Sequence, residues 1–165
     1  MSTQAVRQVP LLDVGRGNGP LMNDIQAAIA KVCQSGRFVL GPDVQEFEKN
    51  VATYTGARHA IGCASGSDAI LLALMAYDIG PGDEVICPSF TFFATASAVA
   101  RLGARPVFID IDPATFNFDT AKLAAAITKR TKAIIPVHLF GQCANMLETL
   151  AISVQHNVPV IEDAA

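Results

Sequence analysis

The sequence has few charged side chains. They make up 16% of its 165 residues, whereas hydrophobic residues make up 51%, and an average globular domain has roughly 25% charged residues. The net charge of −3 is small and no run of like charges occurs, which excludes the basic surface of a nucleic-acid-binding protein and the basic face of a membrane-surface helix. A monomeric domain normally has more charged residues on its surface than this sequence supplies. We therefore expect part of the surface of this domain to be buried against another surface.

A segment that would direct the chain to or across a membrane is also missing. The N-terminal residues 1–8 lack the apolar stretch of a secretory signal. The longest wholly apolar run, residues 69–77, is far too short to span a bilayer, which takes about 20 residues. We therefore expect a cytoplasmic protein.

The four cysteines, Cys33, Cys63, Cys87 and Cys143, form no C-x-x-C pair and show no metal-like spacing. We expect reduced thiols, most of them buried. A catalytic thiol is the alternative, but no histidine lies at a diagnostic distance. Metal clusters, Walker loops and nucleophile elbows are absent from the sequence, and the glycine-rich residues 15–19 do not follow a predicted strand, as a dinucleotide fingerprint would.

Short apolar runs alternate with helical patterns from residue 57 onward. Their first residues are 22 to 27 positions apart, which leaves room for one crossover helix between successive strands. This pattern predicts an α/β fold, with a mostly parallel sheet and helices on both faces. Pro136 and Pro159 cannot donate to a ladder, which argues against regular central positions for the last two strands. The five predicted strands are residues 60–64, 84–87, 106–110, 133–137 and 158–161.

The N-terminal part of the chain has a different pattern. Residues 22–34 and 44–54 show helical periodicity, and glycine and proline separate the two segments. We expect residues 1–56 to form an N-terminal helical arm that packs onto the sheet, and residues 57–165 to form the α/β domain. The helix predicted at 68–77 is apolar on all sides, which is typical of an element buried on more than one side, for example at a subunit interface.

Ligands bind at the carboxyl ends of the strands in an open α/β sheet, so the residues that follow each apolar run are the candidates for a functional site. Residues 64–68 follow the first predicted strand and open a helix, where backbone N–H groups and hydroxyls can receive a phosphate. The alternative is that Ser65 or Ser67 only caps the helix and Asp68 offsets its dipole.

Three further strand ends carry candidate residues. Phe92 follows the second predicted strand and offers a flat apolar face to a planar ring, unless it is an ordinary core residue. Glu162 and Asp163 follow the last strand. A carboxylate there could hold a proton on a heterocyclic nitrogen, as a pyridoxal ring requires, or could cap a helix or form a surface ion pair. His138 is a weaker candidate, because a lone histidine is more often structural.

Taken in order, these segments resemble the DegT/DnrJ/EryC1/StrS family of sugar aminotransferases, which have the aspartate-aminotransferase fold (fold type I). The resemblance runs from about residue 10 to residue 165. It rests on motifs that occur in order at the family's spacing: GRFVLGP at 36–42, HA at 59–60, SGSDA at 65–69, GPGDEVI at 80–86, PSFTF at 88–92, GARPVFIDID at 103–112, PVHLFG at 136–141 and IEDAA at 161–165.

The resemblance implies pyridoxal 5'-phosphate (PLP) as the cofactor. Gly66 and Ser67 would hold its phosphate, Phe92 would stack on the pyridine ring and Asp163 would bond the ring nitrogen. Ser67 stands where many relatives have threonine, and it keeps the hydroxyl. The resemblance also implies a homodimer that transfers an amino group from glutamate or glutamine to a keto sugar nucleotide, in polysaccharide or amino-sugar biosynthesis.

In such enzymes the lysine that forms the Schiff base lies downstream of the matched motifs, as do the last strands and a small C-terminal domain. The lysines of this sequence all lie elsewhere: Lys31, Lys49, Lys122, Lys129 and Lys132. We therefore expect an N-terminal fragment without a catalytic residue of its own, inactive alone, that binds PLP weakly or not at all. One alternative is a noncatalytic remnant that dimerises or binds a phosphorylated ligand, and another is a nucleotide-binding Rossmann domain.

Overall fold

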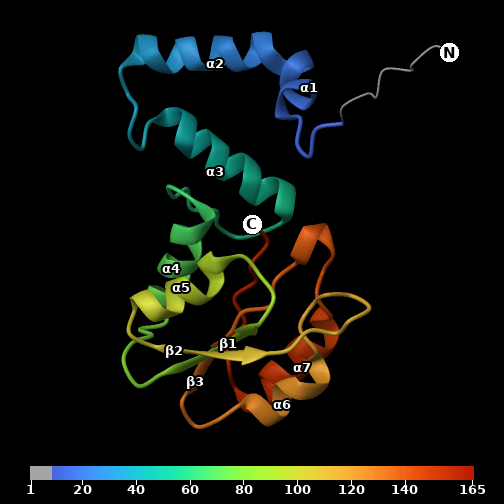
Figure 1. Ribbon diagram of the computed structural model, residues 1–165. Coiled ribbons are helices and arrows are strands. Elements are labelled where there is room, and N and C mark those ends of the chain that lie inside the picture. Colours follow the sequence, from blue (N-terminus) through green and yellow to red (C-terminus); the bar gives the residue numbers. More distant parts are fainter. Residues whose placement is uncertain (1–8) are drawn as a thin grey trace, which may run out of the picture. The chain divides into compact units, whose positions relative to one another are not determined.

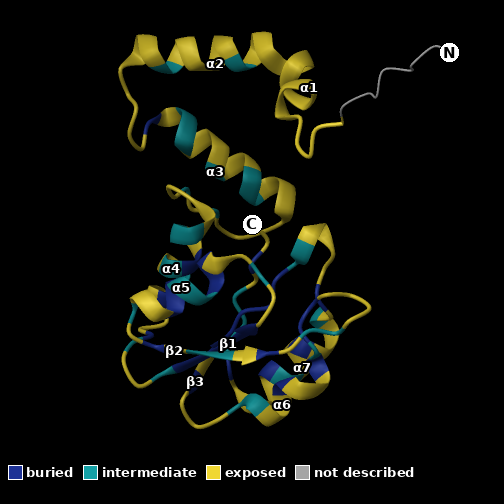
Figure 2. Cartoon of the chain, in the orientation of Figure 1, coloured by how far each residue is buried: buried dark blue, intermediate teal, exposed yellow. Residues whose placement is uncertain are grey.

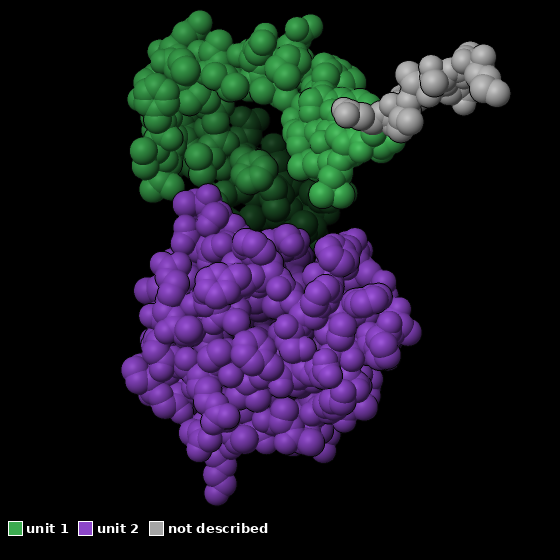
Figure 3. Space-filling model, viewed as in Figure 1, with its two compact units in different colours: residues 1–62 green, residues 63–165 purple. Residues whose placement is uncertain are grey.

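The computed structural model describes residues 9–165, which fall into two compact units (Figure 3). The first unit ends at Gly62 and the second runs from Cys63 to Ala165. The first unit contains α1 (Val14–Asn18), a 3-10 turn (Gly19–Leu21), α2 (Met22–Ser35) and α3 (Pro42–Thr55). Helices are thus confirmed at 22–34 and 44–54. Gly36 and Gly56 end α2 and α3 in the left-handed conformation, with φ of 64° and 71°, which glycine adopts without strain.

The helices of the first unit bury none of their residues. Both α2 and α3 are exposed or half-buried along their whole length (Figure 2). Large apolar side chains are among the exposed ones, including Ile29 at 58%, Phe47 at 63% and Tyr54 at 92% exposure. Because apolar faces of this kind are normally covered, these helices present surface for another element or chain.

The second unit is built on a parallel sheet of three strands in the order β2–β1–β3. Four α-helices and short helical turns lie before, between and after the strands. In chain order the elements are α4 (Gly66–Ala76), β1 (Glu84–Pro88), α5 (Phe93–Arg101), β2 (Arg105–Ile109), a 3-10 turn (Thr120–Lys122), α6 (Leu123–Ala126), β3 (Thr131–Ile134), a 3-10 turn (Leu139–Gly141) and α7 (Met146–His156).

Helices cover both faces of this sheet (Figure 1). Successive strand residues point to opposite faces, so β1 sends Val85 and Cys87 into one hydrophobic cluster and Ile86 into another. The first cluster contains Ile70 and Leu74 of α4 with residues of α5. The second contains Leu123 of α6, and Met146 and Ile152 of α7 pack against it while partly buried. The predicted α/β fold with helices on both faces is therefore confirmed.

Two of the five predicted strands do not form regular strands in the structure. Residues 60–64 form none, since no neighbouring strand pairs with them among the described residues, and Ile61 is 83% exposed. Residues 158–161 do run parallel to β3, but only one isolated bridge joins them, Ile134 with Val160, and a second bridge, Val137 with Asp163, lies just beyond both segments. Pro136 and Pro159 interrupt the ladder there because proline has no N–H to donate.

The cysteines also differ from expectation. Only Cys87 is buried, whereas Cys33, Cys63 and Cys143 are exposed free thiols. Cys63 is exposed because it lies in the irregular segment before α4 and not in a strand. Burial raises the pKa of the Cys87 thiol to about 12, which keeps it protonated and unreactive at neutral pH.

A buried carboxylate ties the amino end of the sheet together. The Glu84 side chain, 4% exposed, accepts hydrogen bonds from the hydroxyl of Thr128 at 2.6 Å and from Nη2 of Arg130 at 2.6 Å. The guanidinium of Arg105 lies 3.6 Å away. The hydrogen bonds from Thr128 and Arg130, with the positive charges of Arg130 and Arg105, hold the pKa of Glu84 below its ordinary value of 4.5.

This arrangement predicts a defined pH dependence of stability. Because the pKa of Glu84 is lower in the folded than in the unfolded chain, its stabilising contribution is complete above the ordinary value of 4.5 and is lost as the pH falls through the folded pKa. We expect Glu84→Gln to lower the Tm at neutral pH, and the Tm difference from the wild type to shrink below that value. Thermal unfolding across an acid pH series measures this, and a Tm difference that stays constant into strong acid would contradict it.

Candidate functional site

A cavity of about 1010 Å³ opens at the carboxyl ends of the parallel strands, within the second unit. Cavities of roughly 300–1,000 Å³ are typical of small-molecule and cofactor sites. Four segments line it: the start of α4, the segment between β1 and α5, the segment after β3, and the residues around Asp163. The lining includes all four predicted site residues, Gly66, Ser67, Phe92 and Asp163, together with Phe90, Thr91, His138 and Phe140.

The start of α4 presents free donors to this cavity. The Ser65 hydroxyl caps the helix by accepting a hydrogen bond from the N–H of Asp68 at 3.2 Å. The Asp68 carboxylate accepts from the Ser65 hydroxyl and lies 3.9 Å from Arg101, and Asp68 is not part of the cavity lining. Ser67 makes no side-chain hydrogen bond within residues 9–165. The first N–H groups of a helix have no partner in the helix, so Gly66 and Ser67 can receive an anion.

Gly66 is required by a close approach of two segments. A Cβ atom at this position would lie 2.8 Å from the Cβ of Ala165, closer than carbon atoms pack. The residues after Asp163 therefore run directly against the start of α4. This contact brings the helix start and the Asp163 carboxylate to the same cavity.

Phe92 is an exposed aromatic side chain at the cavity. It is the residue before α5, and 76% of its surface is exposed, so the alternative that it is an ordinary core residue is wrong. Its neighbour Phe90 packs against Phe116 with ring centroids 6.2 Å apart, whereas Phe92 forms no ring pair in the described part of the chain. An unpaired ring face at a cavity is available to stack on a planar ligand.

Asp163 is the buried one of the two adjacent carboxylates. It is 7% exposed, and its backbone is fixed beside the segment after β3: its N–H donates to the carbonyl of Pro136, and its carbonyl accepts from the N–H of His138, both at 2.9 Å. Its Oδ2 accepts from the Thr95 hydroxyl at 2.7 Å and its Oδ1 from the N–H of Ala165 at 3.2 Å.

No basic side chain within residues 9–165 forms an ion pair with Asp163. Burying a carboxylate without a positive partner is unfavourable, so the cavity suits a ligand that brings a protonated nitrogen to this position. Glu162 is different, because its side chain is 54% exposed and bonds Nε2 of His138 at 2.9 Å. The structure thus distinguishes the two carboxylates, which their position after the last strand does not.

His138 also reaches the cavity, with a defined tautomer. Its Nδ1 accepts a hydrogen bond from the backbone N–H of Ala144 at 3.2 Å, so the ring proton is on Nε2, which donates to Glu162. Both ring nitrogens are therefore occupied, and the histidine orders the segment after β3. This agrees with the structural role that a lone histidine suggests.

Two lining or supporting residues were not found from the sequence. Thr95 supports Asp163 from α5, and its signal in the sequence was a single β-branched polar residue in an alanine-rich helix. Phe140 is 89% exposed at the cavity with a φ of 54°. A left-handed backbone is strained for a non-glycine residue, and such strain concentrates at functional sites.

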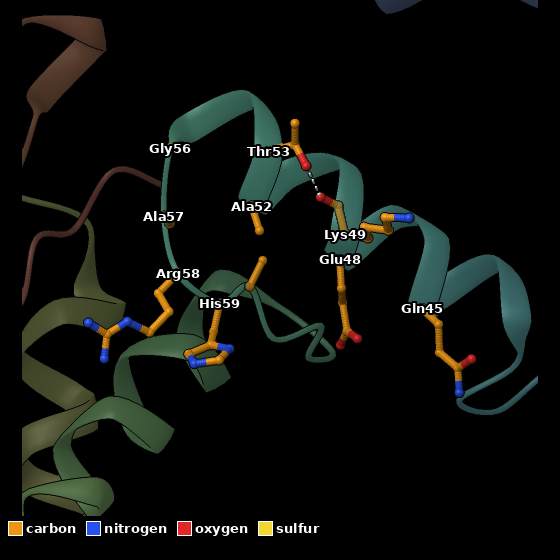
Figure 4. Close-up of a pocket in the computed structure, with 10 residues that line it drawn as sticks. Gln45, Glu48, Lys49, Ala52, Thr53, Gly56, Ala57, Arg58 and His59 are labelled. Carbon is orange, nitrogen blue, oxygen red and sulfur yellow. Dashed lines mark hydrogen bonds between the residues drawn. The ribbon is translucent and has the colours of Figure 1, made fainter.

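A second hollow, of about 530 Å³, lies within the first unit between α3 and residues 56–60. Figure 4 shows that Lys49 and Arg58 point away from each other there, and that the Thr53 hydroxyl bonds the backbone of its own helix, at 2.9 Å from the carbonyl of Lys49. The polar side chains of this hollow do not converge on one point, so they do not form a binding site for a small ligand.

None of the lysines lines the cavity at the strand ends. Lys31 and Lys49 belong to the first unit. Lys122 forms an ion pair with Asp119 at 3.2 Å. Lys129 and Lys132 lie at the amino end of β3, the end opposite to the cavity.

None of the helices in the described part of the chain is long and apolar enough to cross a membrane.

Comparison with known proteins gives a consistent match. The model of the DegT/DnrJ/EryC1/StrS aminotransferase family matches residues 21–165. Similar curated proteins are a pleiotropic regulatory protein of Geobacillus stearothermophilus, 54% identical over 95% of this chain and 42% of the relative, and UDP-2-acetamido-2-deoxy-3-oxo-D-glucuronate aminotransferase of Pseudomonas aeruginosa, 49% identical over 95% of this chain and 44% of the relative. The chain thus spans less than half the length of these relatives.

Solved structures match equally well. DesV of Streptomyces venezuelae, in complex with a ketimine intermediate, superposes with a TM-score of 0.92 at 43% identity, over 95% of this chain and 42% of the other. NtdA of Bacillus subtilis, with bound cofactor PMP, superposes with a TM-score of 0.92 at 39% identity, over 99% of this chain and 38% of the other.

Proposed function

Since the chain belongs to the DegT/DnrJ/EryC1/StrS aminotransferase family, we propose that it is the N-terminal part of a PLP-dependent enzyme that transfers an amino group from glutamate or glutamine to a keto sugar nucleotide. One observation carries the proposal. A helix start with free donors, an exposed aromatic ring and a buried carboxylate line the same cavity. These are the three features that a phosphorylated pyridine needs.

Gly66 and Ser67 would hold the cofactor phosphate. The N–H groups at the start of α4 point out of the helix, and the positive end of the helix dipole favours an anion there. The Ser67 hydroxyl adds a further donor. Because Ser65 provides the helix cap, binding a phosphate at Ser67 would not cost the helix its capping bond.

Phe92 and Asp163 would hold the ring. Phe92 offers its exposed face for stacking, which fixes the plane of the pyridine. When bound, PLP acts as an electron sink for the substrate, and this chemistry is favoured when the ring nitrogen carries a proton. The buried Asp163 carboxylate, which has no cationic partner within residues 9–165, would accept a hydrogen bond from that nitrogen and stabilise its positive charge.

The substrate class is inferred from relatives. Two of them are named for amino transfer to UDP-linked sugars, from Pseudomonas aeruginosa at 49% identity and Acidithiobacillus ferrooxidans at 48%. Two more are dTDP-sugar transaminases, at 45% and 42% identity. A nucleotide-linked keto sugar is therefore the proposed acceptor, for polysaccharide or amino-sugar biosynthesis.

We also propose an assembly and a cellular location. The exposed apolar side chains of α2 and α3 and the low charge content support a homodimer in which these surfaces are buried. A cytoplasmic location is consistent with soluble sugar-nucleotide substrates.

We further propose that the lysine forming the Schiff base is outside residues 1–165, because none of the lysines of this chain lines the cavity. The chain alone would then have no group to form the covalent link and shuttle the proton. It would be inactive by itself and would bind PLP weakly at most.

Borohydride reduction in the presence of PLP tests this proposal. We expect peptide mass spectrometry of the full-length protein to show one reduced PLP–lysine adduct beyond residue 165, and the 1–165 chain to show no specific adduct. A stoichiometric adduct on Lys122, Lys129 or another lysine of the chain would contradict the proposal.

A second experiment tests the reaction itself. We expect the full-length protein to produce 2-oxoglutarate from glutamate when a keto sugar nucleotide is present. PLP binding without amino transfer would favour the noncatalytic alternative.

A further inference from the structure

Thr95 is a polar side chain that is completely buried, at 0% exposure, in the alanine-rich helix α5. Its hydroxyl lies 2.7 Å from Oδ2 of Asp163, a residue 68 positions further along the chain. The same hydroxyl lies 3.0 Å from the hydroxyl of Thr91, one turn before it. Thr91 lines the cavity and Thr95 does not.

The direction of these hydrogen bonds follows from the available protons. An ionised carboxylate can only accept, so Thr95 must donate its single hydroxyl proton to Asp163. The hydroxyl of Thr91 must then donate to the oxygen of Thr95. The two threonines therefore form a chain of donors that ends on the carboxylate.

This is an unusual use of a helical threonine. A threonine in a helix normally bonds its hydroxyl to the backbone carbonyl four residues earlier, as Thr149 of α7 does with the carbonyl of Asn145 at 2.7 Å. Thr95 instead uses its proton on a distant carboxylate. The other donor to Asp163 is a backbone N–H, that of Ala165, so Thr95 supplies the side-chain contact that orients this carboxylate within the described residues.

We propose that Thr95 is a positioning residue that, with Thr91, holds the Asp163 carboxylate in the orientation needed to bond a protonated ring nitrogen in the cavity. This inference rests on the proposed PLP function, but the contact between Thr95 and Asp163 exists without a ligand. Each carboxylate oxygen accepts one hydrogen bond from the protein and keeps a second acceptor site. The two threonines thus fix the orientation of the carboxylate and leave it able to accept a hydrogen bond from the ring nitrogen.

Thr95→Val tests the proposal, because valine has nearly the same shape and lacks the hydroxyl. In the full-length protein we expect the affinity for PLP to fall by about tenfold to 100-fold, the usual effect of losing a hydrogen bond to a charged group, because a carboxylate that is no longer held in place would lose its bond to the ring nitrogen. We also expect the chemical shift of the ring nitrogen in isotope-labelled PLP to move toward the unprotonated form. Thr95→Ser keeps the hydroxyl and should restore both the affinity and the shift.

Thr149→Val is the matched control. Thr149 is also 0% exposed and also uses its hydroxyl in a hydrogen bond, to a backbone carbonyl, but it belongs to α7 on the opposite face of the sheet. Its replacement should lower stability and leave the ring-nitrogen shift and the PLP affinity unchanged. Equal effects of Thr95→Val and Thr149→Val on these two readouts would overturn the proposal, because both would then reflect general loosening.

A double-mutant cycle in cofactor-free full-length protein separates this inference from the proposed function. Thr95→Val should destabilise the wild type more than it destabilises the Asp163→Asn variant, since the two residues interact. Additive effects would overturn the Thr95–Asp163 interaction whether or not PLP binds. A different outcome is that the two substitutions are coupled but the wild-type protein binds no PLP. This would contradict the proposed function, and it would also contradict the role of Thr95 in orienting Asp163 toward the ring.

Discussion

Asp163→Asn in the full-length protein is expected to lower kcat by about 10²-fold to 10³-fold, the size of effect seen when one preorganised electrostatic group is removed from an active site. The substitution keeps the shape of the side chain and removes its charge. The buried position, at 7% exposure, then has no negative charge to stabilise a proton on the ring nitrogen. Steady-state kinetics with saturating PLP measures the effect.

Glu162→Gln is the control for this prediction. Glu162 is the adjacent carboxylate, but its side chain is 54% exposed and bonds His138 instead of facing the cavity. It should keep most of the activity, because an exposed interaction contributes little. Similar losses in the two variants would contradict the assignment of Asp163, since only Asp163 lines the cavity.

Leu74→Ala should lower the free energy of unfolding by about 2–5 kcal/mol, the typical effect of deleting a buried leucine side chain. Leu74 is 0% exposed and joins α4 to the strand residues Val85 and Cys87 in one hydrophobic cluster. Its removal leaves a cavity beneath the helix whose start lines the proposed phosphate site. Urea unfolding of the cofactor-free protein measures this.

Leu72→Ala, in the same helix, is the matched control. Leu72 is 48% exposed, and its replacement should change the free energy of unfolding by about 1 kcal/mol or less. If Leu72→Ala were as destabilising as Leu74→Ala in the protein alone, then the exposed side of α4 would be covered in solution. That result would contradict the burial pattern of the single chain and would identify α4 as part of an interface.

The sheet could be predicted from the sequence where local signals were sufficient. Three of the strands were found because each contains a short apolar run between turn signals, as at residues 84–88. The bounds were less accurate for β3, which covers residues 131–134 and not the predicted 133–137. Residues 60–64 show the same local pattern but are not a strand, because strand formation depends on a neighbour that the pattern does not reveal. Residues 158–161 run beside β3 as expected, but Pro136 and Pro159 prevent a regular ladder.

The candidate site was predictable to a similar extent. The rule that ligands bind at strand carboxyl ends led to residues 64–68, to Phe92 and to the pair Glu162 and Asp163. The family resemblance then pointed to Gly66, Ser67 and Asp163, and the structure gathers these three and Phe92 at one cavity. Local sequence could not separate Asp163 from Glu162, since burial is decided by tertiary packing. Thr95 was missed for the same reason, because its contact joins residues 68 positions apart.

A crystal structure of the full-length protein with PLP tests the central claim most directly. The account predicts the phosphate at the start of α4, within hydrogen-bonding reach of Gly66 and Ser67, the ring against Phe92, and the ring nitrogen about 2.6–3.2 Å from a carboxylate oxygen of Asp163. A phosphate bound elsewhere, or a ring whose nitrogen faces away from Asp163, would contradict it.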